Sequence, residues 1–303
     1  MKFKPKKLAL LVKSAFLVTG ISMGMAAHGA LVVTTSTDAT ALGNALAGAG
    51  VTVSGATLTG ASTQQGTFTG GVSAGIGIES GVILTTGDAT LAPGPNSSDS
   101  TGESVGGGSD PDLATLATGT IFDANVLQFD FTTTTGDLFF QYVFASDEYN
   151  EFVDGGVNDV FGFFVNGANI AIVPGTTDTP VAIDNVNCGN PFDPPAGGSN
   201  CGLFNNNDLD DGGPFFDIEY DGFTDVFTAS VLGLGEGTHT IKLAIGDVGD
   251  GVFDSAVFLL AGSFVDQPEP QQPPPTNGIP APGTLLLAGL GLAGLWALRR
   301  RKR

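Results

Sequence analysis

Acidic side chains, accompanied by Asn and Gly, form three groups that could bind a metal ion. The groups are Asp147 to Asp159, Asn205 to Gly212, and the trio Asp247, Asp250 and Asp254. Hard oxygen ligands spaced along loops are typical of Ca²⁺ sites. We expect the first group to hold a Ca²⁺ cofactor, with these ligands: Asp147, Glu148, Asp154 and Asp159.

The second group is an incomplete EF-hand pattern. Asn206, Asp208 and Asp210 stand at ligand positions and Asp217 stands at the twelfth, but Asp211 replaces the Gly that the loop requires. A plainer alternative applies to all three groups. Turns favour Asp and Asn, and a high net charge keeps surface proteins soluble, so the acids could be a solvated surface only.

Residues suited to enzymatic catalysis are sparse in the body of the chain, by which we mean residues 31–265. The body contains one His, His239, and one cation, Lys242, among the 31 acidic residues of the chain. A glycoside hydrolase needs only two carboxylates, but with so many present no pair stands out. The absence of Arg and the acidity disfavour nucleic-acid binding. We therefore expect no catalytic residue and no enzymatic activity.

Three motifs of the body point to one family. They are Gly75–Gly87, then Tyr142–Val153 with Asn158–Gly167, then His239–Asp250 with Phe253–Leu259. In this order they resemble the choice-of-anchor L domain, and the resemblance runs from Thr34 to Phe264. That family consists of bacterial surface domains found with alternative C-terminal anchors. The resemblance implies an extracellular β-rich domain and implies no established activity.

Alternating apolar and polar residues predict many short strands that position these motifs. Asp137–Ala145 is apolar on both faces, which indicates a central strand. The other predicted strands are Val126–Phe131, Phe161–Val165, Asn169–Val173, Phe227–Val231, Thr240–Ile245 and Ala256–Phe264. A helix capped by Ser36 or Thr37 and a second one after Ser109 precede most of them. The fold class is all-β with minor α, a β-sandwich of jelly-roll or Greek-key type.

The two ends of the chain predict export. Ten of the 11 cations lie at the ends, and residues 1–30 have the basic, apolar and small-residue regions of a signal peptide. The body at 31–265 is followed by a Pro-rich linker at 266–282. Residues 283–303 predict a short transmembrane sorting helix with a basic tail. Its 15 apolar residues (284–298) would span only about 22 Å as a helix.

The linker, short helix and basic tail together resemble the PEP-CTERM sorting signal of Gram-negative bacteria. Pro280, Ala281 and Pro282 occupy the place of the motif, with Ala281 where Glu is usual. The resemblance implies an exosortase-like sorting enzyme as partner. It also implies a transient anchor in the inner membrane, through the C-terminal helix, before release to the cell surface or medium.

The two cysteines fit an oxidising compartment. Cys188 and Cys201 flank a loop rich in Pro, Gly and Asn, and we expect them to form a disulfide. Two Cys without neighbouring His make a poor zinc site.

We therefore expect an exported, non-enzymatic protein of the cell surface or extracellular matrix, with a role in adhesion or in biofilm and floc formation. Exopolysaccharide or another surface component is the expected partner. The alternatives are a lectin-like carbohydrate-binding module and, less favoured, an acid-catalysed polysaccharide hydrolase. Exposed aromatic side chains would indicate the first, and two facing carboxyl groups in a groove would indicate the second.

Overall fold

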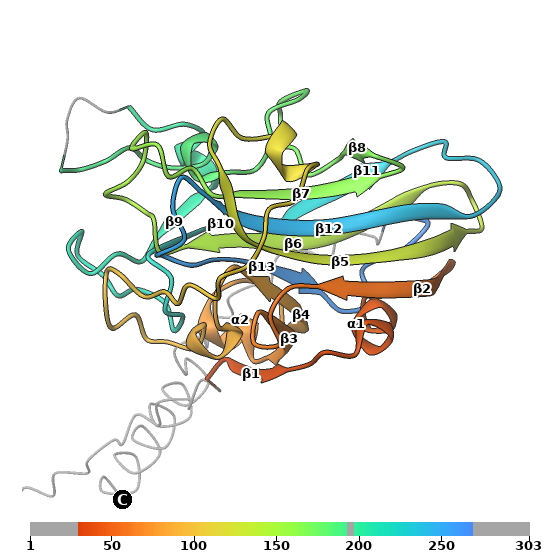
Figure 1. Cartoon of the computed structure of the whole chain (residues 1–303), viewed down its shortest axis with the longest axis horizontal. Helices are drawn as coiled ribbons and strands as arrows, with labels where there is room; N and C mark the ends of the chain where they lie inside the picture. The colour runs from red at the N-terminus through yellow and green to blue at the C-terminus, as the bar shows by residue number, and fades with distance from the viewer. Residues whose placement is uncertain (1–29, 193–196, 269–303) are drawn as a thin grey trace, which may run out of the picture.

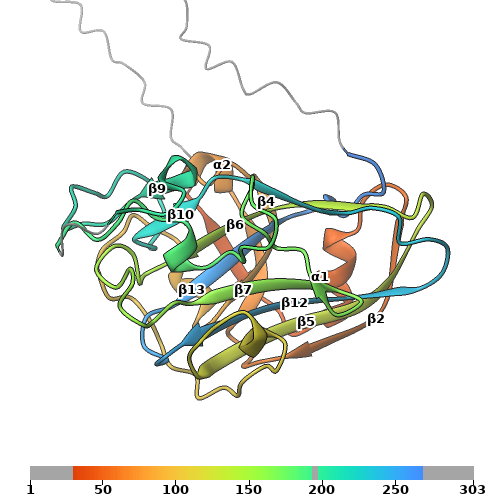
Figure 2. The same ribbon diagram turned by 90° about the horizontal axis from the view of Figure 1, so that it is seen from above.

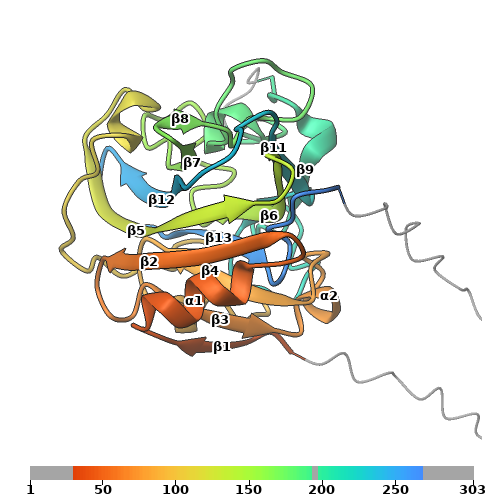
Figure 3. The same ribbon diagram turned by 90° about the vertical axis from the view of Figure 1, so that its right-hand side faces the viewer.

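Two antiparallel β-sheets pack face to face in the computed structural model of the chain, which describes residues 30–192 and 197–268 (Figures 1 and 3). The first sheet has the order β1 (Val32–Thr35), β3 (Gln65–Thr69), β4 (Ser80–Thr85), β13 (Ser255–Leu260), β6 (Leu138–Ser146), β10 (Gly222–Thr224), β9 (Phe204–Asn206), and β11 (Phe227–Val231) also pairs with β6. The second has the order β2 (Val51–Thr59), β5 (Ile121–Thr133), β12 (His239–Val248), β7 (Val160–Val165), β8 (Ala168–Asn169). The predicted all-β sandwich is confirmed.

Helical structure is limited to short pieces in the described part of the chain. The α-helices are α1 (Ala39–Leu46) and α2 (Gly71–Ala74), and the single turns of 3₁₀ helix are η1 (Ala89–Leu91), η2 (Leu113–Thr115), η3 (Ile183–Asn185) and η4 (Cys201–Leu203). The segment around η2 lies over β5 and β12 (Figure 2), where buried Leu113 packs against Val126 and Ala244. The outer face of the second sheet is thus partly covered.

The main core lies between the sheets and is rich in aromatic side chains. Phe140 of β6 stacks on Phe264, with 4.5 Å between ring centroids, and meets the edge of Phe163 of β7 at 4.2 Å. Tyr142, two residues further along β6, also faces this core, whereas Val143 faces a second core on the outer side of the sheet. The prediction that this strand is central and buried on both faces is confirmed.

Several sequence-based boundaries were wrong, among them the end of the strand expected at Ala256–Phe264, which lies at Leu260. Helix α1 is capped by Asp38, whose carboxylate accepts a hydrogen bond from the Ala41 N–H at 2.9 Å, rather than by Ser36 or Thr37. The predicted helix after Ser109 shortens to η2. The strand expected at Asn169–Val173 ends at Asn169.

Several strand ends and loops meet at one end of the sandwich. Ser146, the last residue of β6, pairs with both Gly222 of β10 and Ser255 of β13. The loop after β6 and the long connection before β10, coloured green to teal, gather at the left of Figure 1. The tight antiparallel pairing therefore brings together loops that are far apart in the sequence.

The predicted signal peptide at 1–30 (apart from Ala30), the sorting motif at Pro280–Pro282 and the terminal helix at 283–303 lie outside the described residues. Within residues 30–192 and 197–268, no helix is long and apolar enough to cross a membrane.

Candidate cation-binding site

The loop that follows β6 starts with a buried carboxylate. The Asp147 N–H donates a hydrogen bond to the Asp254 carbonyl oxygen at 3.0 Å, which fixes the start of the loop against the residue that precedes β13. The Asp147 side chain is 1% exposed. Neither of its carboxylate oxygens has a hydrogen-bond partner among the described residues, so this buried group has no protein donor to stabilise its charge.

A second buried carboxylate without partners lies close by, near the end of β12. The β5–β12 pairing shifts register between Ile245 and Asp247, and such a bulge redirects the side chains around it. Asp247 is 2% exposed, and neither of its carboxylate oxygens has a partner within hydrogen-bond geometry, although the Thr86 and Asp159 side chains lie close enough to affect its pKa. Its neighbour Asp159 is better satisfied, because it accepts from the Val248 N–H at 2.9 Å and from the Ser255 hydroxyl at 2.7 Å.

Six more acidic side chains complete what we call the acidic end cluster. Its members are Asp147, Glu148, Glu151, Asp159, Glu219, Asp221, Asp247 and Asp254. The loop from 96 to 103 supports part of it. Glu219 accepts hydrogen bonds from Ser97 Oγ at 2.9 Å and Thr101 Oγ1 at 2.7 Å, and Asp221 Oδ1 accepts from Asn96 Nδ2 at 2.5 Å. The second oxygen of Asp221 has no partner.

Burial and mutual repulsion raise the pKa values of four carboxyl groups of the cluster, those of Asp147, Glu148, Asp221 and Asp247. Burial raises the pKa of Glu148 to about 9, and the neighbouring Asp159 adds to the shift. Burial likewise raises the pKa of Asp221 to about 9, and the repulsion of Glu151 adds to the shift. The pKa of Asp147 and that of Asp247 lie well above the ordinary value for the same two reasons. The folded protein therefore resists ionisation of these groups in the absence of a cation.

No cationic side chain offsets this charge in the described part of the chain. Lys242, the single Lys or Arg of the body, forms ion pairs with Asp110, at 2.9 Å, and with Asp112, on the outer face of the second sheet. His239 begins β12, at the opposite end of that strand from Asp247, with Asn166 and the Gly235 carbonyl as its hydrogen-bond partners. The acidic end cluster thus has only protons or dissolved cations to balance it.

The structure brings together three of the four ligands expected from the sequence. Asp147, Glu148 and Asp159 lie in the acidic end cluster, whereas Asp154 is exposed and its N–H donates to the Asp184 carboxylate at 2.7 Å. Across residues 30–192 and 197–268, no three Asp, Glu, His or Cys side chains already converge on one point as metal ligands do. The cluster is a set of neighbouring carboxylates and not a closed coordination sphere.

The incomplete EF-hand pattern folds as a turn. The Asp208 carboxylate accepts hydrogen bonds from the N–H groups of Asp210, at 2.7 Å, and Asp211, at 3.1 Å. The Asn207 side-chain oxygen accepts hydrogen bonds from the Phe215 and Phe216 N–H groups. Its side-chain nitrogen donates to the carbonyl oxygens of Ile218 and Tyr220. These contacts organise the loop around side chain to backbone hydrogen bonds.

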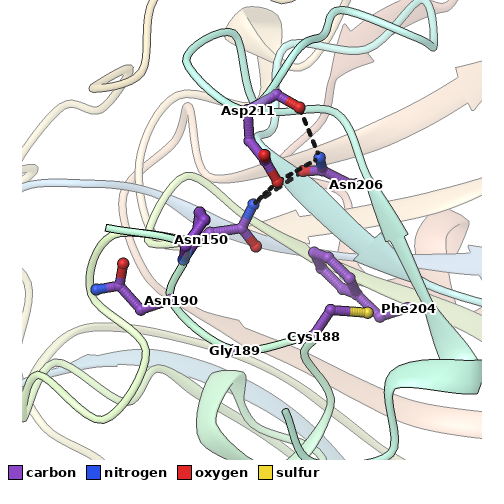
Figure 4. A pocket seen from close by; sticks show the side chains of 8 residues that line it. Asn150, Cys188, Gly189, Asn190, Phe204, Asn206 and Asp211 are labelled. Atoms are coloured by element: carbon purple, nitrogen blue, oxygen red, sulfur yellow. Dashed lines mark hydrogen bonds between the residues drawn. The ribbon is translucent and has the colours of Figure 1, made fainter. Parts of the chain in front are cut away.

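The predicted disulfide between Cys188 and Cys201 is confirmed, with 4.4 Å between the Cα atoms. It closes the loop beside the acidic end cluster. A pocket of about 220 Å³ lies at this point, between the disulfide, the loop after β6 and β9 (Figure 4).

The sequence also contains the Gly-x-Ser-x-Gly pattern of some hydrolases twice, at Gly71–Gly75 and Gly102–Gly106. Ser73 lies within α2, and Ser104 donates its hydroxyl hydrogen to Asp123 at 3.1 Å. Neither hydroxyl is hydrogen-bonded to His239, so the described residues do not assemble the Ser–His pair that such a mechanism requires.

Comparison with known families confirms the resemblances that the motifs indicated. Residues 32–265 match the Choice-of-anchor L domain, and residues 278–302 match the PEP-CTERM protein-sorting motif. No curated protein and no solved structure matches the chain significantly.

Proposed function

The chain belongs to the choice-of-anchor L family and carries a PEP-CTERM sorting motif, and from these facts we propose that its body is a non-enzymatic adhesion domain whose acidic end cluster binds Ca²⁺. The family and the motif together mark an exported cell-surface protein of Gram-negative type, sorted by an exosortase. The proposal adds a role in attaching cells to one another or to matrix in biofilms and flocs.

One observation carries the calcium part of the proposal. Asp147 and Asp247 are both almost fully buried and have no partner on any of their four carboxylate oxygens. An ionised carboxylate buried without a partner costs several kcal/mol, so each group must either hold a proton or meet a cation. Ca²⁺ prefers six to eight oxygen ligands and tolerates irregular geometry, which suits a cluster of carboxyl groups from several loops.

Binding would bring separate segments of the chain together. The carboxyl groups of the cluster come from separate segments of the chain. Asp147 follows β6, Asp221 precedes β10, and Asp247 is the second-last residue of β12. An ion held among them would cross-link three segments and make that end of the sandwich rigid, a useful property in a domain that must carry mechanical load between cells.

The test is a calcium titration in which the melting temperature is measured at each calcium concentration. The ionic strength is kept fixed, because added salt also screens repulsion. If Ca²⁺ binds only the folded state, a concentration 100 times the Kd adds about 2.7 kcal/mol of stability. Asp147→Asn combined with Asp247→Asn should abolish this gain. A matched control is Asp178→Asn with Glu236→Gln, which makes the same charge change at two exposed loop positions.

Equal melting temperatures in calcium chloride and in sodium chloride of the same ionic strength would refute the calcium site. The adhesive role has its own test. Cells that produce the wild-type protein should aggregate in Ca²⁺ and disperse in chelator, whereas a deletion strain should not aggregate in either. Normal aggregation of the deletion strain would exclude adhesion as the function.

A further inference from the structure

The pocket beside the disulfide has the dimensions and lining of a small polar binding site. Its volume is about 220 Å³, and its walls come from three separate segments of the chain. The side chains that matter for the argument are Asn150, Asn206 and Asp211 on one side and Phe204 and Cys188 on the other (Figure 4), and Pro191 also lines the pocket. Such a volume accommodates one six-membered ring and is below the range of drug-sized pockets, about 300–1,000 Å³.

The polar wall of the pocket contains a buried hydrogen-bond acceptor without a partner. Asn150 is 2% exposed, and its amide nitrogen donates to Asn206 Oδ1 at 2.9 Å and to Asp211 Oδ2 at 3.4 Å. These bonds fix the amide plane, and its oxygen is left without a donor. In Figure 4 this oxygen faces the side on which Phe204 and Cys188 lie. It is therefore placed to accept a hydrogen bond from a molecule in the pocket.

Phe204 gives the pocket an aromatic face. The Phe204 ring packs against the Tyr149 ring, with 4.7 Å between centroids, so its position is set from behind by a fully buried side chain. The segment from Cys188 to Pro191, which includes Asn190, supplies the rest of the lining. A pyranose ring matches the combination, because it has C–H groups on its faces and hydroxyl groups around its edge, and aromatic side chains pack well against such C–H faces.

We propose that this pocket binds a single neutral sugar residue of an extracellular glycan. A hydroxyl group would donate to the free oxygen of Asn150, and a C–H face would lie on Phe204. Asp211 in the wall and the nearby acidic end cluster repel anionic groups, so uronic acids and phosphorylated sugars should be excluded. The choice of an extracellular source rests on the proposed adhesive function, whereas the pocket itself is separate from the calcium site.

The binding measurement uses the exported, processed protein and individual sugars as probes. The neutral probes are glucose, galactose, mannose and N-acetylglucosamine, and glucuronic acid is the anionic probe. Saturation-transfer NMR and calorimetry should detect at least one neutral sugar at a single site. A Kd on the order of 1 mM is expected, because one ring offers few contacts. Glucuronic acid should bind at least tenfold more weakly.

Two variants locate the site. Pro191→Trp places a large side chain at an exposed position of the pocket rim and should reduce affinity at least tenfold without disturbing the fold. Phe204→Leu keeps an apolar side chain and removes the aromatic face, with a similar loss. Phe192→Leu is the matched control, because Phe192 is the exposed neighbour of Pro191 and does not line the pocket. Circular dichroism confirms that each variant is folded.

The proposal is overturned if none of the four neutral sugars binds, if glucuronic acid binds equally well, or if Pro191→Trp and Phe204→Leu both bind like the wild type. These results are distinguishable from a failure of the proposed function. The protein could prove insensitive to calcium, or cells could aggregate without the protein. If sugar binding is nevertheless observed and is lost in Pro191→Trp, the pocket remains assigned and only the calcium or adhesion part is removed.

Discussion

Asp147 and Asp254 are joined through their backbones, because the N–H of the first donates to the carbonyl oxygen of the second at 3.0 Å. The bond extends the β6–β13 pairing by one residue beyond Ser146 and Ser255. Two carboxyl groups that are far apart in the sequence are therefore held as close neighbours by the sheet itself. Their repulsion contributes to raising the pKa of Asp147, after the larger effect of burial.

The first prediction concerns pH in the absence of calcium. Folding raises the pKa of Glu148 and Asp221 to about 9 and that of Asp159 and Asp254 to about 7, whereas the unfolded chain titrates near 4. The folded state therefore binds more protons than the unfolded state between these values. Stability should be greatest near or below about pH 4 and should fall as the pH rises through 7 to 9.

Bound calcium should reverse this trend, since its ligands are deprotonated carboxylates. The stabilisation by Ca²⁺ should be small at pH 5 and should grow up to pH 9. Melting temperatures measured from pH 5 to 9, in chelator and in Ca²⁺, check both statements. A melting temperature in chelator that rises from pH 5 to pH 9 would contradict the assignment of these carboxyl groups as buried and unpaired.

The second prediction concerns the uncompensated charge itself. In chelator at pH 8, Asp147→Asn should raise the free energy of unfolding, because an amide of the same shape replaces a buried carboxyl group that resists ionisation. An effect of about 1 kcal/mol or more is expected. The exposed change Asp178→Asn should alter stability by less than about 0.5 kcal/mol. Chemical denaturation measures both, and destabilisation by Asp147→Asn would show that the carboxylate has a partner.

The third prediction concerns the disulfide. Replacing both Cys188 and Cys201 with Ser should lower the free energy of unfolding by about 3 kcal/mol, the value for a loop of roughly 15 residues in the chain-entropy model. Both cysteines are exposed, so a reductant should act on the folded wild-type protein with the same effect. Urea denaturation with and without reductant measures it, and the Ser variant should not respond to reductant.

The fourth prediction concerns Asn207, which is fully buried and makes four hydrogen bonds to the backbone of residues 215–220. Asn207→Ala should cost at least about 2 kcal/mol, because several buried backbone groups lose their partners. The loop that carries Glu219 and Asp221 should also loosen, so calcium stabilisation should weaken. Asn205→Ala is the control, because Asn205 has one exposed hydrogen bond, to Asp225. Equal stability of the two variants would refute this role.

Much of the fold could be predicted because apolar alternation reports burial directly. The segment 137–145 has apolar residues on both faces, and β6 is indeed covered on both sides by separate cores. The strand β2 was missed because its Thr, Ser and Gly residues resemble a loop, and its burial is partial. Its place is set by pairing with β5, a tertiary interaction that no local pattern contains.

The candidate site was predicted only where its residues are close in sequence. Asp147, Glu148 and Asp159 belong to one dense acidic segment, so their grouping is visible in the sequence. Glu219 and Asp221 join them because β10 pairs with the end of β6, and this depends on the folded chain. Asp154 was expected to join as well, but its part of the loop points to Asp184 and solvent. The hydrogen bonds made by Asn207 depend equally on long-range folding.

The bond between Cys188 and Cys201 also sets a time at which the pocket is completed. The sulfur of Cys188 is part of the pocket wall, and thiols remain reduced in the bacterial cytoplasm. A newly made chain therefore carries an unfinished pocket until it has crossed the inner membrane. Sugars of the cytoplasm, including those used for metabolism, would meet the protein before the pocket is closed. If the pocket binds sugar as proposed, oxidation during export would act as a maturation step that restricts binding to glycans outside the cell.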